Sequence, residues 1–189
     1  MRYRSSLLGV LALVACVTSA LACGYHSGLE NAAFDVVHPK SIGVAVAIRQ
    51  ATDRGFLESR PTPVTLASLW GGDYRDAVRQ LQELDEKISR AAPEMNDGED
   101  WKFAFVYVRT RLWAQYTVRS DGATVMVHTP AAASSEIVVL SDESVLKAIN
   151  SGRLSFQTAV AEGLIQFSND RNDKAYQILR AAFEGVGGQ

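Results

Sequence analysis

The sequence is poor in the residues that form cross-links and metal centres. Its 189 residues include two cysteines, Cys16 and Cys23, and three histidines. One cysteine falls inside an expected N-terminal leader, so we expect no internal disulfide and a core that is stable without one. Cys23-x-x-His26 is half of a metal-binding pattern, but a metal ion needs three or four converging ligands. We therefore predict neither a metal site nor a cofactor.

Motifs for catalysis are also lacking. There is no Gly-x-Ser-x-Gly sequence for a nucleophilic serine, and Gly71-Gly72-Asp73 has neither the spacing nor the lysine of a phosphate-binding loop. The carboxylate pairs Glu83/Asp85 and Asp97/Glu99 fall on predicted solvated surface, where ordinary pKa values suit solubility better than proton transfer. We expect a protein that is not an enzyme.

An excess of positive charge is missing as well. The chain has 19 basic and 21 acidic side chains. Removing Arg2 and Arg4 with the leader leaves 17 basic and 21 acidic side chains, a net charge of −4. This balance argues against a nucleic-acid partner and against electrostatic attachment to anionic lipid.

The N-terminus has the layout of an export signal. Arg2 and Arg4 form a basic start, residues 7–17 form an apolar core, and Ala20-Leu21-Ala22 supplies small residues at the cleavage positions. The apolar run is too short for a stable membrane span. We interpret residues 1–22 as a removable signal peptide.

Cleavage after Ala22 would make Cys23 the first mature residue. The sequence Ala20-Leu21-Ala22-Cys23 resembles the lipobox of bacterial lipoproteins, although Ala20 stands where that family usually has leucine. The resemblance implies a lipidated Cys23 and a membrane partner reached through its acyl chains, on the periplasmic side of a bacterial envelope membrane. Two alternatives are plain secretion with a free Cys23 and lipidation of Cys16.

Residues 23–72 are predicted to form a tether and a helical N-terminal extension. Ser41 is a candidate N-cap for a helix over residues 42–54, although the apolar run Val44 to Ile48 also fits a buried strand. Residues 58–63 contain two prolines and read as a linker. The pair Gly71-Gly72 indicates a boundary with the main domain, residues 73–185, which precedes a tail of residues 186–189.

The main domain begins with the clearest amphipathic pattern, a helix that starts at Asp73 and ends at Ala92-Pro93. A strand over residues 101–109 is apolar on both faces and should therefore be central. Further strands, helices and a hairpin turn follow: strands 111–119, 123–129, 136–140 and 164–167, helices 142–149, 155–162 and 173–183, and a turn at Asp121-Gly122. We predict an α+β fold, with a five-stranded, largely antiparallel or mixed sheet covered by helices.

This order of elements over residues 74–183 resembles the sterol carrier protein type 2 family. The resemblance covers about 110 of the 189 residues and rests on pattern: Ile137 to Leu140, Val145 to Ile149, Gly152-Arg153-Leu154, Ala159 to Gly163 and Leu164 to Phe167. Two features depart from the family. Ser168-Asn169-Asp170 replaces the usual Gly-Asp, and Thr110-Arg111 lacks a turn glycine.

The resemblance implies an apolar tunnel that accepts acyl chains or sterols, although some members are accessory domains with no demonstrated ligand. Such a pocket needs bulky apolar walls. Each aromatic side chain on a strand also fits an ordinary core position. The candidate lining residues are Phe103, Phe105, Tyr107, Trp113, Phe156 and Phe167.

Two functions are compatible with this sequence. In the first, an exported, lipid-anchored protein binds or carries a lipid-like ligand. In the second, the core is filled, and the domain is an interaction or accessory module for an envelope protein partner, with residues 34–57 as the docking segment.

Overall fold

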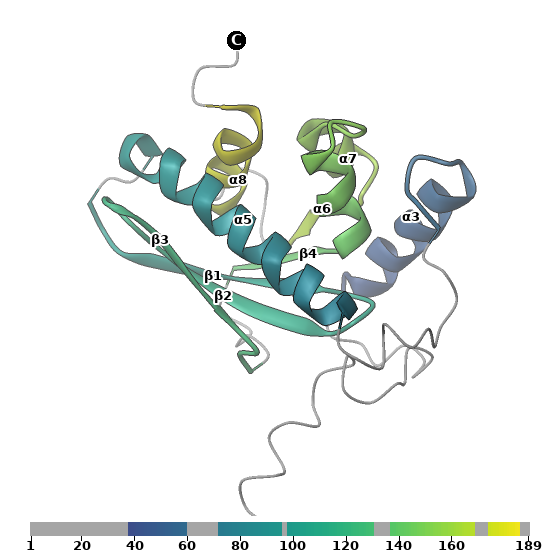
Figure 1. Ribbon diagram of the computed structural model, residues 1–189, viewed down its shortest axis with the longest axis horizontal. Helices are drawn as coiled ribbons and strands as arrows, with labels where there is room; N and C mark the ends of the chain where they lie inside the picture. Colours follow the sequence, from purple (N-terminus) through teal and green to yellow (C-terminus); the bar gives the residue numbers. More distant parts are fainter. Residues whose placement is uncertain (1–37, 60–71, 96–97, 131–136, 169–173, 186–189) are drawn as a thin grey trace, which may run out of the picture.

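The computed structural model describes five stretches of the chain. The expectations for the leader, Cys16, Cys23, the tether and the 60–71 linker lie outside the described residues. Within the described part, five helices pack against one five-stranded sheet, which confirms the predicted α+β class (Figure 1). The described stretches are residues 38–59, 72–95, 98–130, 137–168 and 174–185.

The sheet has the strand order β3-β2-β1-β4-β5 and is mixed. Three neighbouring pairs, β1–β2, β2–β3 and β4–β5, are antiparallel, whereas β1 and β4 are parallel. A two-residue hairpin at Ser120-Asp121 joins β2 to β3, one residue earlier than predicted. The strands are β1 (Trp101–Tyr107), β2 (Leu112–Arg119), β3 (Gly122–Val127), β4 (Val138–Ser141) and β5 (Gln166–Phe167).

Strand β1 lies at the centre of the sheet and is buried on both faces, as its sequence predicts. Phe103, Phe105 and Tyr107 point to one face, and Ala104 and Val106 point to the other. The first face is the one that the long helix covers. We call it the helix face.

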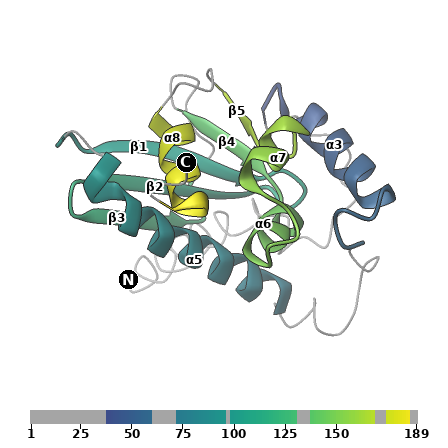
Figure 2. The same cartoon turned by 90° about the horizontal axis from the view of Figure 1, so that it is seen from above.

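Helix α5 (Gly72–Met95) crosses the helix face over β2 and β3 and packs beside α8 (Figures 1 and 2). The hydroxyl of Ser89 accepts a hydrogen bond from the Ala123 amide (2.8 Å) and donates one to the Ala123 carbonyl (3.3 Å). It thereby satisfies backbone groups at the edge of the sheet. The prediction that Ala92-Pro93 ends this helix is wrong. Pro93 lies in the last turn, where its missing N–H removes a single hydrogen bond, and the helix continues to Met95.

Three shorter helices cover the β4 side of the helix face: α6 (Glu143–Asn150), α7 (Phe156–Ala161) and α8 (Lys174–Glu184). Asp142 caps α6 by accepting a hydrogen bond from the Ser144 amide (3.0 Å). Gly152 follows α6 with φ at 73°, the left-handed conformation expected of a glycine that closes a helix. Local sequence signals therefore set the bounds of α6.

The N-terminal helix α3 (Ser41–Asp53) confirms the helical interpretation of this segment over the strand alternative. Ser41 is not its N-cap: Lys40 holds that position, and the Ser41 hydroxyl donates to the His38 carbonyl (2.6 Å). The buried side of α3, with Val44 and Ile48, joins the same hydrophobic core as the sheet and the other helices. The Lys40 ammonium group donates to the carbonyl of Phe167 in β5.

Candidate functional site

Five of the six aromatic residues predicted to line a pocket are buried on the helix side of the sheet, where they fall into two groups. Phe103, Phe105 and Tyr107 of β1 lie on the helix face, and Phe167 pairs with Val139 on that face. Phe156 is buried from α7.

Trp113 does not join them. It pairs with Val106 on the opposite face of the sheet, so it cannot line the same space. The alternation that places Leu112 and Ala114 inward already implies this position, because neighbouring strand residues point to opposite faces.

The rings on β1 and β2 pack directly against one another. Phe103 and Tyr116 stack with their centroids 4.9 Å apart. Phe105 meets Tyr107 edge-on at 5.6 Å and Tyr116 edge-on at 6.4 Å. These distances lie in the range of favourable aromatic pairs. Tyr116 was missed as a candidate lining residue, although strand alternation places it on the same face as Leu112 and Ala114.

A second aromatic group joins α7, α8 and β5. Phe156 stacks on Phe183 at 5.5 Å and contacts Tyr176 at 5.8 Å. Tyr176 also meets Phe167 edge-on at 5.7 Å. The final helix therefore supplies aromatic neighbours to both residues that the sequence singled out in this region.

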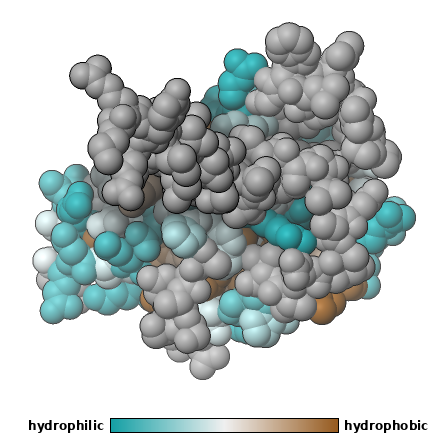
Figure 3. Space-filling view, turned by 90° about the horizontal axis from the view of Figure 1, so that it is seen from below, coloured by the Kyte–Doolittle hydropathy of each residue, from teal (hydrophilic) through white to brown (hydrophobic). Residues whose placement is uncertain are grey.

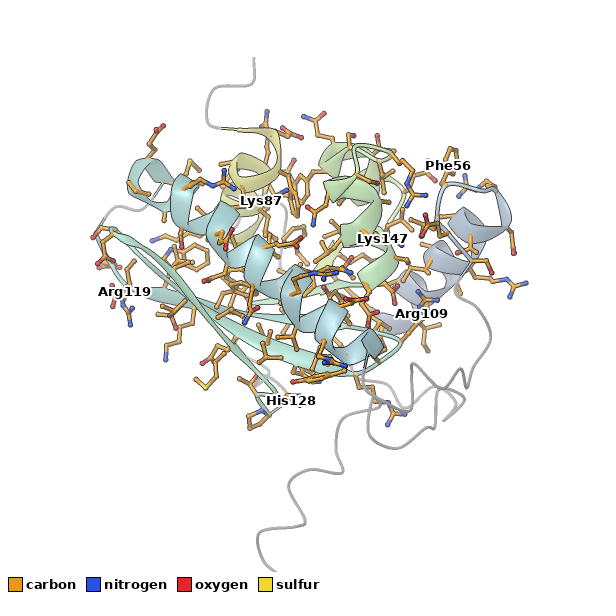
Figure 4. The ribbon with its side chains drawn as sticks, in the orientation of Figure 1. Phe56, Lys87, Arg109, Arg119, His128 and Lys147 are labelled. Atoms are coloured by element: carbon orange, nitrogen blue, oxygen red, sulfur yellow. The ribbon has the colours of Figure 1, made fainter. Side chains whose placement is uncertain are left out.

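Polar side chains meet where α5 and α6 lie side by side. Lys87 of α5 donates to the side-chain oxygen of Asn150 on α6 (2.8 Å), and the Asn150 amide reaches Glu83 (3.5 Å). Gln80 precedes Lys87 by seven residues, about two turns, and therefore lies on the same side of α5. On α6, Glu143 likewise precedes Asn150 by seven residues and lies on the same side of that helix. We call this contact the α5–α6 seam (Lys87 is labelled in Figure 4).

Both helices of the seam begin at the end of the sheet where β1 finishes. Tyr107 pairs with Ser141 immediately before α6, and α5 begins beside His128, whose ring lies 2.7 Å from the Tyr74 hydroxyl. The Tyr107 ring points to the helix face at this end. Tyr107 therefore lies near the start of α6, and Asp142 and Glu83 lie close enough to influence the ionisation of its hydroxyl.

The seam contains buried polar atoms that make no hydrogen bond within the described part of the chain. The Tyr107 hydroxyl and the Gln80 side-chain carbonyl are two of them. Tyr107 is completely buried. Burial raises its pKa well above the usual value, and Tyr116, Asp142 and Glu83 act in the same direction. The phenol is therefore a neutral hydroxyl that can donate one hydrogen bond.

The neighbouring carboxyl groups of Asp142 and Glu143, at the start of α6, have pKa values that are shifted in opposite directions. Burial raises the pKa of Glu143 to about 8, so this group is mostly protonated at neutral pH. Burial opposes ionisation of Asp142 as well, but Arg109 and Ser144 outweigh that effect and hold its pKa below the ordinary value. Arg109 donates through Nε to Asp142 at 2.6 Å. The seam is consequently uncharged at Glu143, while Asp142 stays ionised beside it.

Metal ligands do not gather in the described stretches, which contain no group of three or more His, Cys, Asp and Glu side chains suited to a metal ion. Chemically, the helix face is an aromatic interior that is bordered by polar side chains at the α5–α6 seam. The Tyr107 hydroxyl can donate a hydrogen bond there, and the Gln80 side-chain carbonyl can accept one. Such a border suits a single hydrogen-bonding group on an otherwise apolar molecule.

Comparison with known proteins gives no family assignment. No protein-family model matches the chain, and no curated protein matches it. A double mutant of the sec-alkyl sulfatase PisA1 is 20% identical with a TM-score of 0.37, over 46% of this chain and 13% of that one. The stereoselective inverting sec-alkylsulfatase Pisa1 from Pseudomonas sp. is 18% identical with a TM-score of 0.35, over 50% and 13%. Likenesses this weak carry no argument about function.

Proposed function

We propose that this protein is an exported, lipid-anchored binding protein, not an enzyme, that holds an apolar, lipid-like ligand with one hydrogen-bonding group. The observation that carries the proposal is the Tyr107 hydroxyl, which is fully buried and makes no hydrogen bond within the described residues. Leaving such a group unsatisfied costs about 1–3 kcal/mol. A ligand that accepts a hydrogen bond from Tyr107 would offset that cost.

Two further features support a ligand on the helix face. The aromatic side chains of β1 lead to the polar end at the α5–α6 seam, so an apolar chain and a polar head would each meet matching groups. The order of elements in the structure is also the order on which the resemblance to the sterol carrier protein type 2 family rests. None of the described helices has the length and apolar content of a membrane span. Attachment to a membrane through acyl chains on Cys23 is part of the same proposal and rests on the sequence around that residue.

A matched pair of tyrosine variants tests ligand binding. The full chain is purified from membranes, and bound lipid is measured by native mass spectrometry and by extraction. We expect Tyr107→Phe to retain about five- to tenfold less ligand, because one hydrogen bond is worth about 1 kcal/mol. Tyr116→Phe is the control, since the Tyr116 hydroxyl already donates to the Leu81 carbonyl (2.8 Å). Wild-type protein without bound lipid, or equal retention by all three proteins, would contradict the proposal.

A separate experiment tests the anchor. Cys23→Ser should release the protein from membranes, because the acyl chains supply the membrane affinity through their buried methylene groups. Unchanged membrane retention of this variant would remove lipidation of Cys23 from the proposal. Release by Cys16→Ser instead would assign the modification to Cys16.

The alternative function is an envelope interaction or accessory module with a filled core. The direct contacts among Phe103, Phe105 and Tyr116 favour it, because rings that fill one another's contact surface leave less room for a ligand. Native mass measurement separates the two functions. Empty protein that associates with an envelope protein would support the module, and co-purified lipid would support the carrier.

A further inference from the structure

Helix α3 carries an exposed apolar stripe on the side that faces away from the core. Ile42 is 46% exposed and Val46 is 49% exposed, whereas Val44 and Ile48 are buried on the other side. Residues four apart lie on the same face of a helix. We call Ile42 and Val46 the α3 stripe. Figure 3 shows hydrophobic surface at the end of the molecule where Figure 1 places α3.

The surroundings of the α3 stripe differ in charge from the rest of the chain. Acidic side chains outnumber basic ones overall, but residues 38–52 contain Lys40 and Arg49 and no acidic residue. The first acidic side chain is Asp53, which pairs with Arg49 at 3.0 Å. The Arg49 side chain is 80% exposed and can reach outward from the helix. An apolar stripe beside a long, exposed arginine that can exchange its surface partner Asp53 for a lipid phosphate suits the headgroup region of an anionic bilayer.

The expected anchor and α3 are near each other in the sequence. Seventeen residues lie between Cys23 and Ser41. The covalent chain therefore holds the start of α3 within at most about 65 Å of Cys23 in any conformation. Once Cys23 is held in a bilayer, α3 is the first described helix within reach of its surface, so even weak apolar contacts act at high effective concentration.

We propose that the α3 stripe docks on the surface of the bilayer to which Cys23 is anchored, with Ile42 and Val46 in the interface and Arg49 at the lipid phosphates. This proposal rests on the proposed lipidation of Cys23. Docking of the α3 stripe would fix the orientation of the domain relative to the bilayer. Because α3 packs beside β5 at one edge of the sheet, that edge faces the membrane and β3, at the other edge, faces away. The acidic charge elsewhere on the chain favours the same orientation on anionic lipid.

Two single-cysteine labels measure this orientation. Full-length protein carrying Val46→Cys or Met126→Cys is expressed, purified from membranes, spin-labelled and reconstituted in vesicles of phosphatidylethanolamine and phosphatidylglycerol. Met126 of β3 is 61% exposed and serves as the control at the opposite edge. Collisions of each label with oxygen, which concentrates in lipid, and with a water-soluble nickel chelate are compared. Circular dichroism verifies the fold, and mass spectrometry verifies the acyl chains on Cys23.

We expect the ratio of oxygen to nickel collisions to be several-fold higher at position 46 than at position 126. Equal ratios in acylated protein would overturn docking while leaving the anchor intact. A label at position 46 that is shielded from both reagents would show protein over the stripe, either residues 24–37 or a partner, and would also overturn the proposal. An unmodified Cys23 would instead refute the anchor itself and, with it, the docking of α3.

Discussion

The buried carboxyl group of Glu143 should make the stability of this protein fall as the pH rises. Burial raises the pKa of Glu143 from 4.5 to about 8 in the folded chain. In the unfolded chain the group ionises near its ordinary pKa. Between these two pH values the folded state keeps a proton that the unfolded state has lost, so the free energy of unfolding decreases with pH. The penalty is absent below about pH 4.5 and complete above about pH 8.

The size of this effect follows from the difference between the two pKa values. Each pH unit between them lowers the free energy of unfolding by about 1.4 kcal/mol, which sets an upper limit of about 5 kcal/mol. Glu143→Gln keeps the size of the side chain and removes its titration. The variant should therefore differ from the wild type by less than about 1 kcal/mol at pH 5 and become progressively more stable than it up to about pH 8.

Urea denaturation at intervals from pH 5 to pH 9 measures this difference. The raised pKa of Asp85 and the lowered pKa of His38 also affect the curves, but they are present in both proteins and cancel in the comparison. Glu94→Gln, at the exposed end of α5, is the matched control and should follow the wild type. Parallel curves for wild type and Glu143→Gln would refute the reasoning, because the folded chain would then hold no extra proton at Glu143.

Two further substitutions test the packing around this region, both by urea denaturation at neutral pH. Asp142→Ala removes the cap of α6 and the partner of Arg109, so we expect a loss of about 2–3 kcal/mol, while Asp142→Asn keeps the cap and should lose less. Equal losses in the two variants would show that capping contributes nothing. Ser89→Ala removes both hydrogen bonds to Ala123 and should cost about 1–2 kcal/mol. A neutral result would mean that water replaces the hydroxyl at this edge.

Much of the architecture follows from local sequence patterns. The alternation on β1 predicts a central strand, and the three-and-four spacing of apolar residues predicts α5. Asp142 and Gly152 mark the bounds of α6 because capping depends on groups a few residues apart. The errors are local as well. Pro93 is tolerated in a last turn, and the aromatic character of Trp113 was given more weight than its position on β2.

The candidate site is different, because its parts are remote from one another in the chain. Gln80, Tyr107 and Glu143 come from α5, β1 and α6, and the burial of each depends on the other elements. The sequence by itself determined which segments form helices and strands and which faces are apolar, since backbone sterics and side-chain periodicity act over a few residues. Only the tertiary structure decided that β4 lies parallel to β1 and that α5 and α6 enclose a neutral carboxyl and a phenol, because desolvation and packing depend on neighbours that no local pattern specifies.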